Sequence, residues 1–524
     1  MKDHKLALRG AMVCMHQIHD FMPYFGPDMD SLCSVILEDC AAAGLNCLLV
    51  EYEAMFPWRG EHARISCQDA FTRQDIARFR ACAENLDIQI IPLVQTLGHV
   101  YHILCHEEYA HLREVPEHIQ QCCPSNPQTI KFAKELIDDV IDSHPESQYI
   151  HLGGDECNLL GVCPTCAGIA EHDPAGKYRV YADYYRELTD YVVSKGKTPV
   201  IWHDIIIKYP SAIEELNDRV IFHFWNYGDH SHGRMEEHFE ELKRKVPAAR
   251  IIGGAGIRGE SGHGSLLLSP ALALDNIGRM NQLMIKEKAL GSIVTDWPDC
   301  GTFWMNALSF FTAHGSSAGG GKLDRNWKEH FAAEYFGIDI PEYFDRYDAL
   351  YGPIPLADGF QLRLRSYLNR YDFVQFDPAA TMQRIVRTEV SVPGCGNIFW
   401  YCHRRMLMRE WIGKMEKLLP EVSRHRPEFI SLLLTFKAAE FLLSLSIGQI
   451  IRYWDDRDEL WVGYQLTSSL KEDDLARAGS EMKQLGNEIA DFYGNYSPLP
   501  QVKRFVKELF KEEFRTGFPV PVNK

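Results

Sequence analysis

The chain has 524 residues, of which 46% are hydrophobic and 24% charged, so it can bury a large core and hold a barrel-sized domain plus a second one. Its formal net charge of -17 argues against nucleic acid or an anionic membrane as the main partner. We therefore predict a globular protein with neither kind of partner.

The beginning of the chain carries no recognisable export signal. Residues 1–5 lead directly into a short apolar run, without the apolar core or the cleavage site of a signal peptide. We therefore expect a cytoplasmic location. The fifteen cysteines are scattered without a regular spacing. Because disulfides are rare in cytoplasmic proteins, we expect free thiols.

Apolar strand-like runs alternate with helical segments over about the first 320 residues, which is the pattern of a parallel α/β fold. The predicted strands are 8–15, 45–50, 88–94, the run that starts at 149, 198–202, 220–224, 250–252 and 291–295. The predicted helices are 30–43, 72–85, 129–143 and 178–195. This alternation predicts a (β/α)8 TIM barrel, in which active sites form at the C-terminal ends of the strands.

One of these strands ends in two glycines and two adjacent carboxylates, Gly153, Gly154, Asp155 and Glu156. Neighbouring residues on a strand point to opposite faces, so the two carboxylates are expected to have separate roles. One can give a proton to a leaving group while the other fixes another part of the substrate. The glycines would let a ligand approach the backbone closely. Alternatively, the acidic pair is the N-cap and first-turn acid of a helix.

The stretch from His151 to Glu156 resembles the signature of glycoside hydrolase family 20, the β-N-acetylhexosaminidases. The resemblance implies that Glu156 is the general acid and that Asp155 orients the 2-acetamido group of the substrate, which acts as the nucleophile. It implies exo-acting, retaining removal of terminal β-linked GlcNAc or GalNAc from a carbohydrate or glycoconjugate. No cofactor and no metal are needed for this chemistry.

Other residues resemble substrate-binding positions of the same family. Arg9, in the first strand, is similar to the arginine that clamps sugar hydroxyls, although an exposed strand-edge charge is the alternative. His99 resembles a histidine near the acid. Three tryptophans at strand ends resemble those that wall the acetamido pocket and stack on the sugar ring: Trp202, Trp225 and Trp297.

The chain departs from the family pattern at three places. Asp299 stands where the family usually has a glutamate, which leaves the preference between gluco and galacto sugars open. The seventh strand has glycines at 253, 254 and 256 in place of a tyrosine that binds the acetamido carbonyl, and Tyr227 is the predicted substitute. A second-strand aspartate that pairs with the histidine would be replaced by Glu53 or Glu51, of which we favour Glu53.

The predicted domains are a catalytic barrel, 1–322, and an α-helical C-terminal domain, 323–524, because aromatic and charged residues then follow helical spacing. This arrangement resembles the compact intracellular hexosaminidase D-like branch of the family. The run 429–451 is long enough to span a bilayer, but Lys437 and Glu440 lie in its middle. We expect a buried bundle helix, in a domain that buttresses the barrel or forms a homodimer interface.

Three cysteines lie close together along the chain. Cys163 and Cys166 form a C-x-x-C pair, and Cys157 precedes them. A structural zinc site usually has four ligands, and His172, a candidate for the fourth, is not at a diagnostic spacing. Because a single C-x-x-C is a weak signal, we predict thiols without a metal.

Two other functions stay open at this point. A non-catalytic sugar-binding protein on the same barrel would be expected to lack the acid, so the presence of Glu156 favours catalysis. A metal-dependent barrel hydrolase is suggested by His16 with His19 and by His99 with His102, but no carboxylate or lysine completes such a site in the sequence.

Overall fold

The computed structural model describes residues 5–15, 25–208, 216, 218–228, 234–247, 249–258, 266–297, 303–352, 354, 396–455 and 472–510. Parallel strands form a closed barrel in chain order, with the first strand paired to the last. They are β1 (Leu8–Cys14), β2 (Cys47–Glu51), β3 (Gln89–Leu93), β4 (Tyr149–His151), β5 (Thr198–Trp202), β6 (Ile221–Trp225), β7 (Arg250–Gly256) and β8 (Gly291–Thr295). Every predicted strand is confirmed, and β7 continues beyond its predicted end through the glycines to Gly256.

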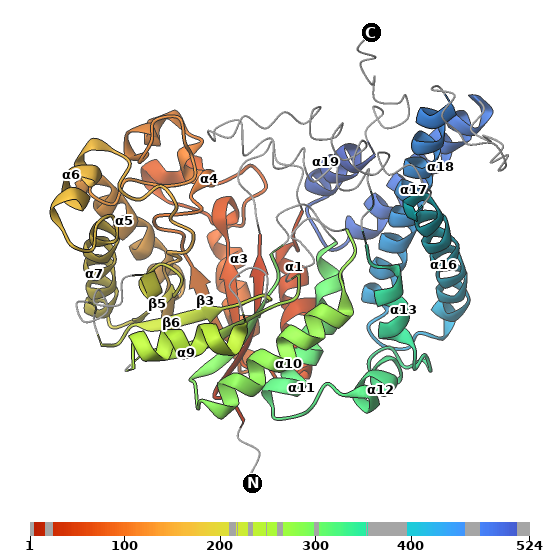
Figure 1. Cartoon of the computed structure of the whole chain (residues 1–524), viewed down its shortest axis with the longest axis horizontal. Helices are drawn as coiled ribbons and strands as arrows, with labels where there is room; N and C mark the ends of the chain where they lie inside the picture. Colours follow the sequence, from red (N-terminus) through yellow and green to blue (C-terminus); the bar gives the residue numbers. More distant parts are fainter. Residues whose placement is uncertain are drawn as a thin grey trace.

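Helices surround these strands (Figure 1). They are α1 (Met29–Ser31), η1 (Leu32–Ile36), α2 (Leu37–Ala42), α3 (Arg73–Asn85), α5 (Pro127–Ser143), α7 (Tyr178–Ser194), α9 (Met235–Lys245), α10 (Pro270–Lys286) and α11 (Leu308–Ala318). Shorter elements in the loops are η2 (Glu53–Met55), η3 (Gly60–Ile65), α4 (Tyr101–Leu104), η4 (Glu107–Leu112), α6 (Pro164–His172), η5 (Ile206–Lys208) and η7 (Trp304–Ala307). The four predicted helices are confirmed, the first with a π-helical segment in its middle.

Local sequence signals explain where two of these helices begin and end. Thr72 caps α3 through a capping box, in which the Thr72 side chain accepts from the Asp75 N–H and the Asp75 carboxylate accepts from the Thr72 N–H. The chain leaves α2 at Gly44, whose φ of +73° favours glycine. Both ends follow from interactions within a few residues, so the sequence alone predicts them.

The core lies in two layers because strand side chains alternate between the barrel interior and the surrounding helices. The inner layer includes Met12, Leu49, Ile91, Val200, Ile252 and Ile293. The outer layer joins the strands to the helices and continues into the C-terminal region. The barrel and the C-terminal helices therefore share one continuous apolar core.

The described part of the C-terminal region is helical, as predicted. Its elements are α12 (Arg325–Tyr335), α13 (Tyr343–Leu350), α16 (Gly396–Leu418), η8 (Leu419–Glu421), α17 (Arg426–Asp455), α18 (Glu472–Tyr493) and α19 (Leu499–Leu509). Figure 1 shows α16, α17 and α18 side by side at one flank of the barrel. Asn306, in η7, donates to Thr435 at 2.8 Å and accepts from Ser431 at 2.8 Å, which fixes α17 to the barrel. The domain boundary at 322, the homodimer interface and the cytoplasmic location stay predictions.

The apolar helix α17 is a bundle helix. Its window 426–447 has a mean hydropathy of 1.7, but 78% of that window is buried inside the protein. Lys437 pairs with Glu416 at 2.9 Å, and Glu440 pairs with Arg405 at 2.8 Å, so both charges have partners on neighbouring helices. The prediction of a buried helix is confirmed.

Candidate active site

The two glycines after β4 are required by backbone conformation and by close packing. Gly153 has φ +68° and Gly154 has φ +96°, which side chains rarely adopt. A Cβ on Gly153 would collide with the Gln95 side chain, and a Cβ on Gly154 would lie 2.8 Å from the hydroxyls of Tyr181 and Tyr185. These contacts explain why both positions are glycine, and close approach of a ligand to this backbone stays a prediction.

Tyrosines of α7 donate hydrogen bonds to the backbone of this turn and of the loop after β3. The Tyr181 hydroxyl donates to the Gly154 carbonyl at 2.9 Å, and the Tyr184 hydroxyl donates to the Thr96 carbonyl at 2.6 Å. The Thr96 hydroxyl donates in turn to the Leu152 carbonyl at 2.7 Å. The loops after β3 and β4 are thus fixed to each other and to α7, which gives the acidic pair a rigid support.

Asp155 and Glu156 lie in different environments. The Asp155 side chain is 12% exposed and the Glu156 side chain is 51% exposed. Glu156 has φ +47°, and its N–H donates to the Asp204 carboxylate at 3.0 Å. The interpretation of the pair as a helix N-cap is wrong, because the next helix, α6, begins at Pro164 and is capped by Cys163.

His99 lies between the two carboxylates. Its Nε2 is 3.5 Å from Asp155 Oδ2 and 3.4 Å from Glu156 Oε2. Burial by itself lowers the pKa of His99, but the charges of Asp155 and Glu156 outweigh it and raise the pKa to about 10. His99 is therefore an imidazolium at neutral pH and compensates the negative charge around it.

Burial is the main reason why the pKa values of the neighbouring acids are high. Burial, aided by the charges of Glu156 and Glu51 and opposed by His99, raises the pKa of Asp155 to about 6. Burial and the charge of Asp155 raise the pKa of Asp204 to about 7. The site therefore combines several carboxyl groups with the His99 imidazolium, an arrangement typical of acid–base sites.

The second-strand acid beside His99 is Glu51. This last residue of β2 is buried, accepts from Gln95 Nε2 at 2.7 Å and from the Cys14 thiol at 2.8 Å, and its charge helps to raise the pKa of His99. Glu53 lies in η2 with φ +48°, beyond the strand end. Our preference for Glu53 is therefore corrected in favour of Glu51, the alternative named from the sequence.

The predicted aromatic residues form one continuous wall. The Trp225 and Tyr227 rings are 5.2 Å apart, and Trp297 Nε1 donates to the Tyr227 hydroxyl at 2.7 Å. Trp297 is 5.9 Å from Trp202. Residues from three strand ends, β5, β6 and β8, thus meet at the same end of the barrel.

The glycine that ends β7 makes room for Tyr227. A Cβ at Gly256 would lie 2.5 Å from the Tyr227 ring. Burial raises the pKa of Tyr227, and the charges of Asp155 and Glu156 add to this effect. The tyrosine therefore lies in the electrostatic field of the acidic pair. Because β7 has a glycine at position 256, the Tyr227 ring can occupy the space that a side chain on β7 would fill.

Trp202 is buried among neutral histidines of the barrel interior. Its ring stacks on His223 at 4.2 Å and lies 4.5 Å from His151. Burial lowers the pKa of His223 to about 3 and also lowers that of His151, so neither ring is charged at neutral pH. Trp202 Nε1 is buried and has no hydrogen-bond partner among the described residues.

Arg9 does not lie with the other predicted residues. It is the second residue of β1 and pairs with Ser292 near the start of β8. Its guanidinium donates to the carbonyls of Gly44 at 2.9 Å and Leu6 at 2.7 Å. The prediction that Arg9 clamps sugar hydroxyls is therefore wrong, because the residue lies at the N-terminal end of the barrel. Asp299, His16 and His19 lie outside the described residues.

Several polar residues at the C-terminal end of the barrel were not predicted from the sequence. Gln95 and Asp204 follow β3 and β5 and contact the residues described above. Arg258, after β7, forms a buried ion pair with Asp296, after β8, at 2.6 Å. Each lies one or two residues beyond a strand, so the rule that barrel sites form at C-terminal strand ends was the signal available.

Comparisons with known proteins agree with this geometry. Residues 49–240 match the model of the glycosyl hydrolase family 20 catalytic domain. Hexosaminidase D of Bos taurus is 29% identical over 195 residues, which cover 36% of this chain and 56% of that protein. Hexosaminidase D of Homo sapiens is 29% identical over 209 residues, which cover 38% and 42%. The matches span about half the length of these curated relatives.

A solved structure has a similar fold. The chitobiase of Flavobacterium johnsoniae superimposes with a TM-score of 0.51 at 15% sequence identity, covering 96% of this chain and 78% of that one. The family-model match runs from β2 to α9 and includes His99, Asp155 and Glu156. Residues 49–240 of this chain are therefore similar to the catalytic domain of glycosyl hydrolase family 20.

Proposed function

We propose that the protein is an exo-β-N-acetylhexosaminidase that removes terminal β-linked GlcNAc or GalNAc with retention of configuration. The proposal rests on the two carboxyl groups that lie beside His99. The Asp155 side chain is buried, whereas the Glu156 side chain is half exposed. Two carboxyl groups in such different environments suit an anion that stays buried and an acid that exchanges protons with substrate and water. The family match of residues 49–240 supports the same reaction class.

Asp155 would orient the nucleophile. Its Oδ1 is buried and has no hydrogen-bond partner among the described residues, so it can accept the N–H of a 2-acetamido group. Its negative charge would stabilise the positive charge that develops as the acetamido carbonyl oxygen attacks C1. The bond from C1 to the glycosidic oxygen breaks as this bond forms, and an oxazolinium ion results.

Glu156 would act on the leaving group. As the acid, it gives its proton to the glycosidic oxygen, and the resulting carboxylate then takes a proton from the water that opens the oxazolinium ion. Its half-exposed side chain suits a group that meets both the departing sugar and water. The Asp204 carboxylate, which accepts from the Glu156 N–H, would hold the acid in place.

The aromatic wall would hold the sugar ring and its acetamido group. Trp225, Tyr227 and Trp297 offer flat apolar faces joined by the hydrogen bond from Trp297 to Tyr227. Tyr227 is the candidate contact for the acetamido carbonyl, because its hydroxyl lies within this wall, next to Trp297 Nε1. Such a pocket would keep the carbonyl oxygen in a near-attack position.

The proposal is tested with chromogenic β-GlcNAc, β-GalNAc and β-glucoside substrates that share one leaving group. The two acetamido sugars are expected to be cleaved, and the glucoside more than about 10³-fold more slowly, because it lacks the internal nucleophile. The ratio of the first two rates measures the preference between gluco and galacto sugars. Absence of cleavage, or equal cleavage of the glucoside, would overturn the proposal, and a requirement for added metal would favour a metal-dependent hydrolase.

The acid limb of the pH profile is expected to report Asp155. The reaction needs the anion, so kcat/KM should fall as the pH drops through about 6, the pKa to which burial raises Asp155. His99→Gln removes a positive charge that lowers this pKa, so the acid limb should move to higher pH by about one unit or more. Profiles of kcat/KM against pH for both proteins measure the shift.

A histidine outside the site provides the control for this shift. His330 lies exposed on α12 and hydrogen-bonds the Asn326 carbonyl, so His330→Gln should leave the profile unchanged. An acid limb that stays in place in His99→Gln, or moves to lower pH, would show that His99 does not compensate the Asp155 charge.

A further inference from the structure

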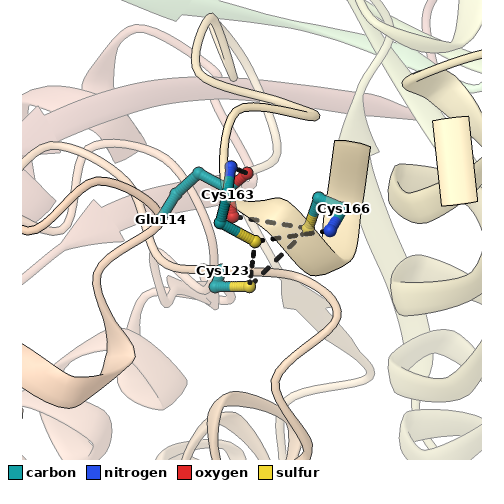
Figure 2. A group of neighbouring side chains, drawn as sticks. All are labelled: Glu114, Cys123, Cys163 and Cys166. Atoms are coloured by element: carbon teal, nitrogen blue, oxygen red, sulfur yellow. Dashed lines mark hydrogen bonds between the residues drawn. The ribbon is translucent and has the colours of Figure 1, made fainter. Parts of the chain in front are cut away.

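Four side chains that could bind a metal lie close together (Figure 2). Glu114 and Cys123 come from the segment between β3 and α5, and Cys163 and Cys166 come from the start of α6. One potential ligand atom from each lies within 4.8 Å of the others. Cys163 is half-buried and the other three residues are buried, so the group is a defined cluster between two loops.

The spacing of these atoms fits a tetrahedral ion. Cys123 Sγ is 3.5 Å from Cys163 Sγ and 3.6 Å from Cys166 Sγ, and Cys166 Sγ is 3.4 Å from Glu114 Oε2. Zinc bonded to sulfur at about 2.3 Å in tetrahedral geometry places two sulfurs about 3.8 Å apart. A small movement of the sulfurs would therefore admit the ion without rearrangement of the backbone.

The backbone already presents donors to the cluster. The N–H groups of Val162 and Cys163 each donate to Glu114 Oε1 at 2.9 Å, which leaves Oε2 facing the thiols. The N–H of Cys166 donates to Cys163 Sγ at 3.3 Å, within the first turn of α6. Such donors, together with the positive end of the helix dipole, stabilise negative charge on the ligands.

The charge of Glu114 gives a second, independent argument. The residue is only 2% exposed, and among the described residues no lysine, arginine or histidine lies within ion-pair distance of it. A buried carboxylate without a cation is costly, and a bound cation would compensate it. Three thiolates and one carboxylate carry the same total charge as the four thiolates of a common structural zinc site.

We propose that Glu114, Cys123, Cys163 and Cys166 bind one Zn²⁺ as a structural site. Thiolate ligands select zinc over harder divalent cations, and four protein ligands leave no open position for catalysis. Each of the three thiols gives up its proton to solvent when its sulfur bonds the ion, so affinity for the ion falls at acidic pH. This proposal replaces the sequence-based prediction of thiols without a metal.

The cluster differs from the one considered from the sequence. The Cys157 thiol donates to the Asp155 carbonyl at 3.4 Å, and His172 Nδ1 bonds the Gly168 carbonyl at 2.7 Å. Neither belongs to the site, and Cys123 and Glu114 take their places from a distant part of the chain. The ion would tie the loop that carries His99 to the loop that carries Asp155.

The first experiment measures zinc in the full chain, expressed with zinc and purified without a chelator. Mass-spectrometric elemental analysis after dialysis should find one zinc per chain in the wild type and almost none in Cys123→Ser and Cys163→Ser. Glu114→Gln should lower the content or raise the dissociation constant. Cys105→Ser is the control, because its thiol lies in the same loop and bonds the His102 carbonyl, so it should keep one zinc.

Cobalt spectra and circular dichroism keep the test independent of folding defects in the variants. Wild-type protein loaded with Co²⁺ should show a thiolate-to-metal charge-transfer band that zinc abolishes, with an unchanged far-ultraviolet spectrum. Wild-type protein that holds no zinc, a disulfide among these cysteines in the native chain, or equal zinc loss in Cys105→Ser would overturn the proposal. The readouts use no substrate, so failure of the site and failure of the proposed hydrolase activity are distinguishable.

Discussion

Glu156→Gln is expected to lower kcat by about 10²–10⁴-fold, the range typical of a lost general acid. The amide has nearly the same shape as the carboxylic acid but cannot give a proton to the glycosidic oxygen. The side chain is half exposed and lies at the end of a turn fixed by α7, so the fold should tolerate the change. Steady-state kinetics on acetamido substrates with leaving groups of different acidity measure the loss.

The loss should depend on the leaving group. A nitrophenolate departs without much protonation, so it should suffer least, whereas an alkyl glycoside should suffer most. Glu171→Gln, an exposed glutamate on α6, should keep wild-type rates. Retention of at least half the wild-type rate with every leaving group would show that Glu156 is not the acid.

Asp155→Asn is expected to lower kcat by about 10²–10³-fold, as for loss of one preorganised electrostatic contact in a buried site. The neutral amide cannot stabilise the positive charge of the oxazolinium ion, although it can still occupy the same space. The loss should be similar for good and poor leaving groups, because attack by the acetamido group accompanies the departure of either kind. This difference from Glu156→Gln separates the two roles in one set of substrates.

A buried aspartate outside the barrel end controls for the effect of changing a buried carboxylate. Asp39, on α2, lies 3.1 Å from His425 in the C-terminal region. Asp39→Asn is expected to change the unfolding midpoint but to leave kcat close to that of the wild type. If Asp155→Asn lowered only thermal stability and left kcat intact, Asp155 would be a structural residue and the substrate-assisted mechanism would be wrong.

Local sequence patterns are enough to predict the order and type of the barrel elements. Strands such as 88–94 and 291–295 are apolar because residues of parallel strands are covered by helices on one face and packed inside the barrel on the other. The caps at Thr72 and Gly44 follow from contacts with chain neighbours. The adjacent carboxylates Asp155 and Glu156 are equally visible, since they directly follow a strand.

The residues that meet at the site could not be predicted in the same way, because they come from distant parts of the chain. Arg9 and Glu51 both belong to strands, but Arg9 lies at the start of β1 and Glu51 at the end of β2, so only Glu51 lies beside His99. Tyr227 occupies space that Gly256 leaves free on the next strand. Such relations depend on the register and closure of the barrel, which no local pattern specifies.

The candidate zinc site also combines residues that are visible as a sequence motif with residues that only the fold brings next to them. The C-x-x-C pair of Cys163 and Cys166 is visible in the sequence, but Cys123 lies 40 residues before Cys163, and Glu114 lies 52 residues before Cys166. Nothing in the residues between them fixes that separation as a ligand spacing. The two loops meet because the parallel strands β3 and β4 are neighbours and deliver their following segments to the same end of the barrel.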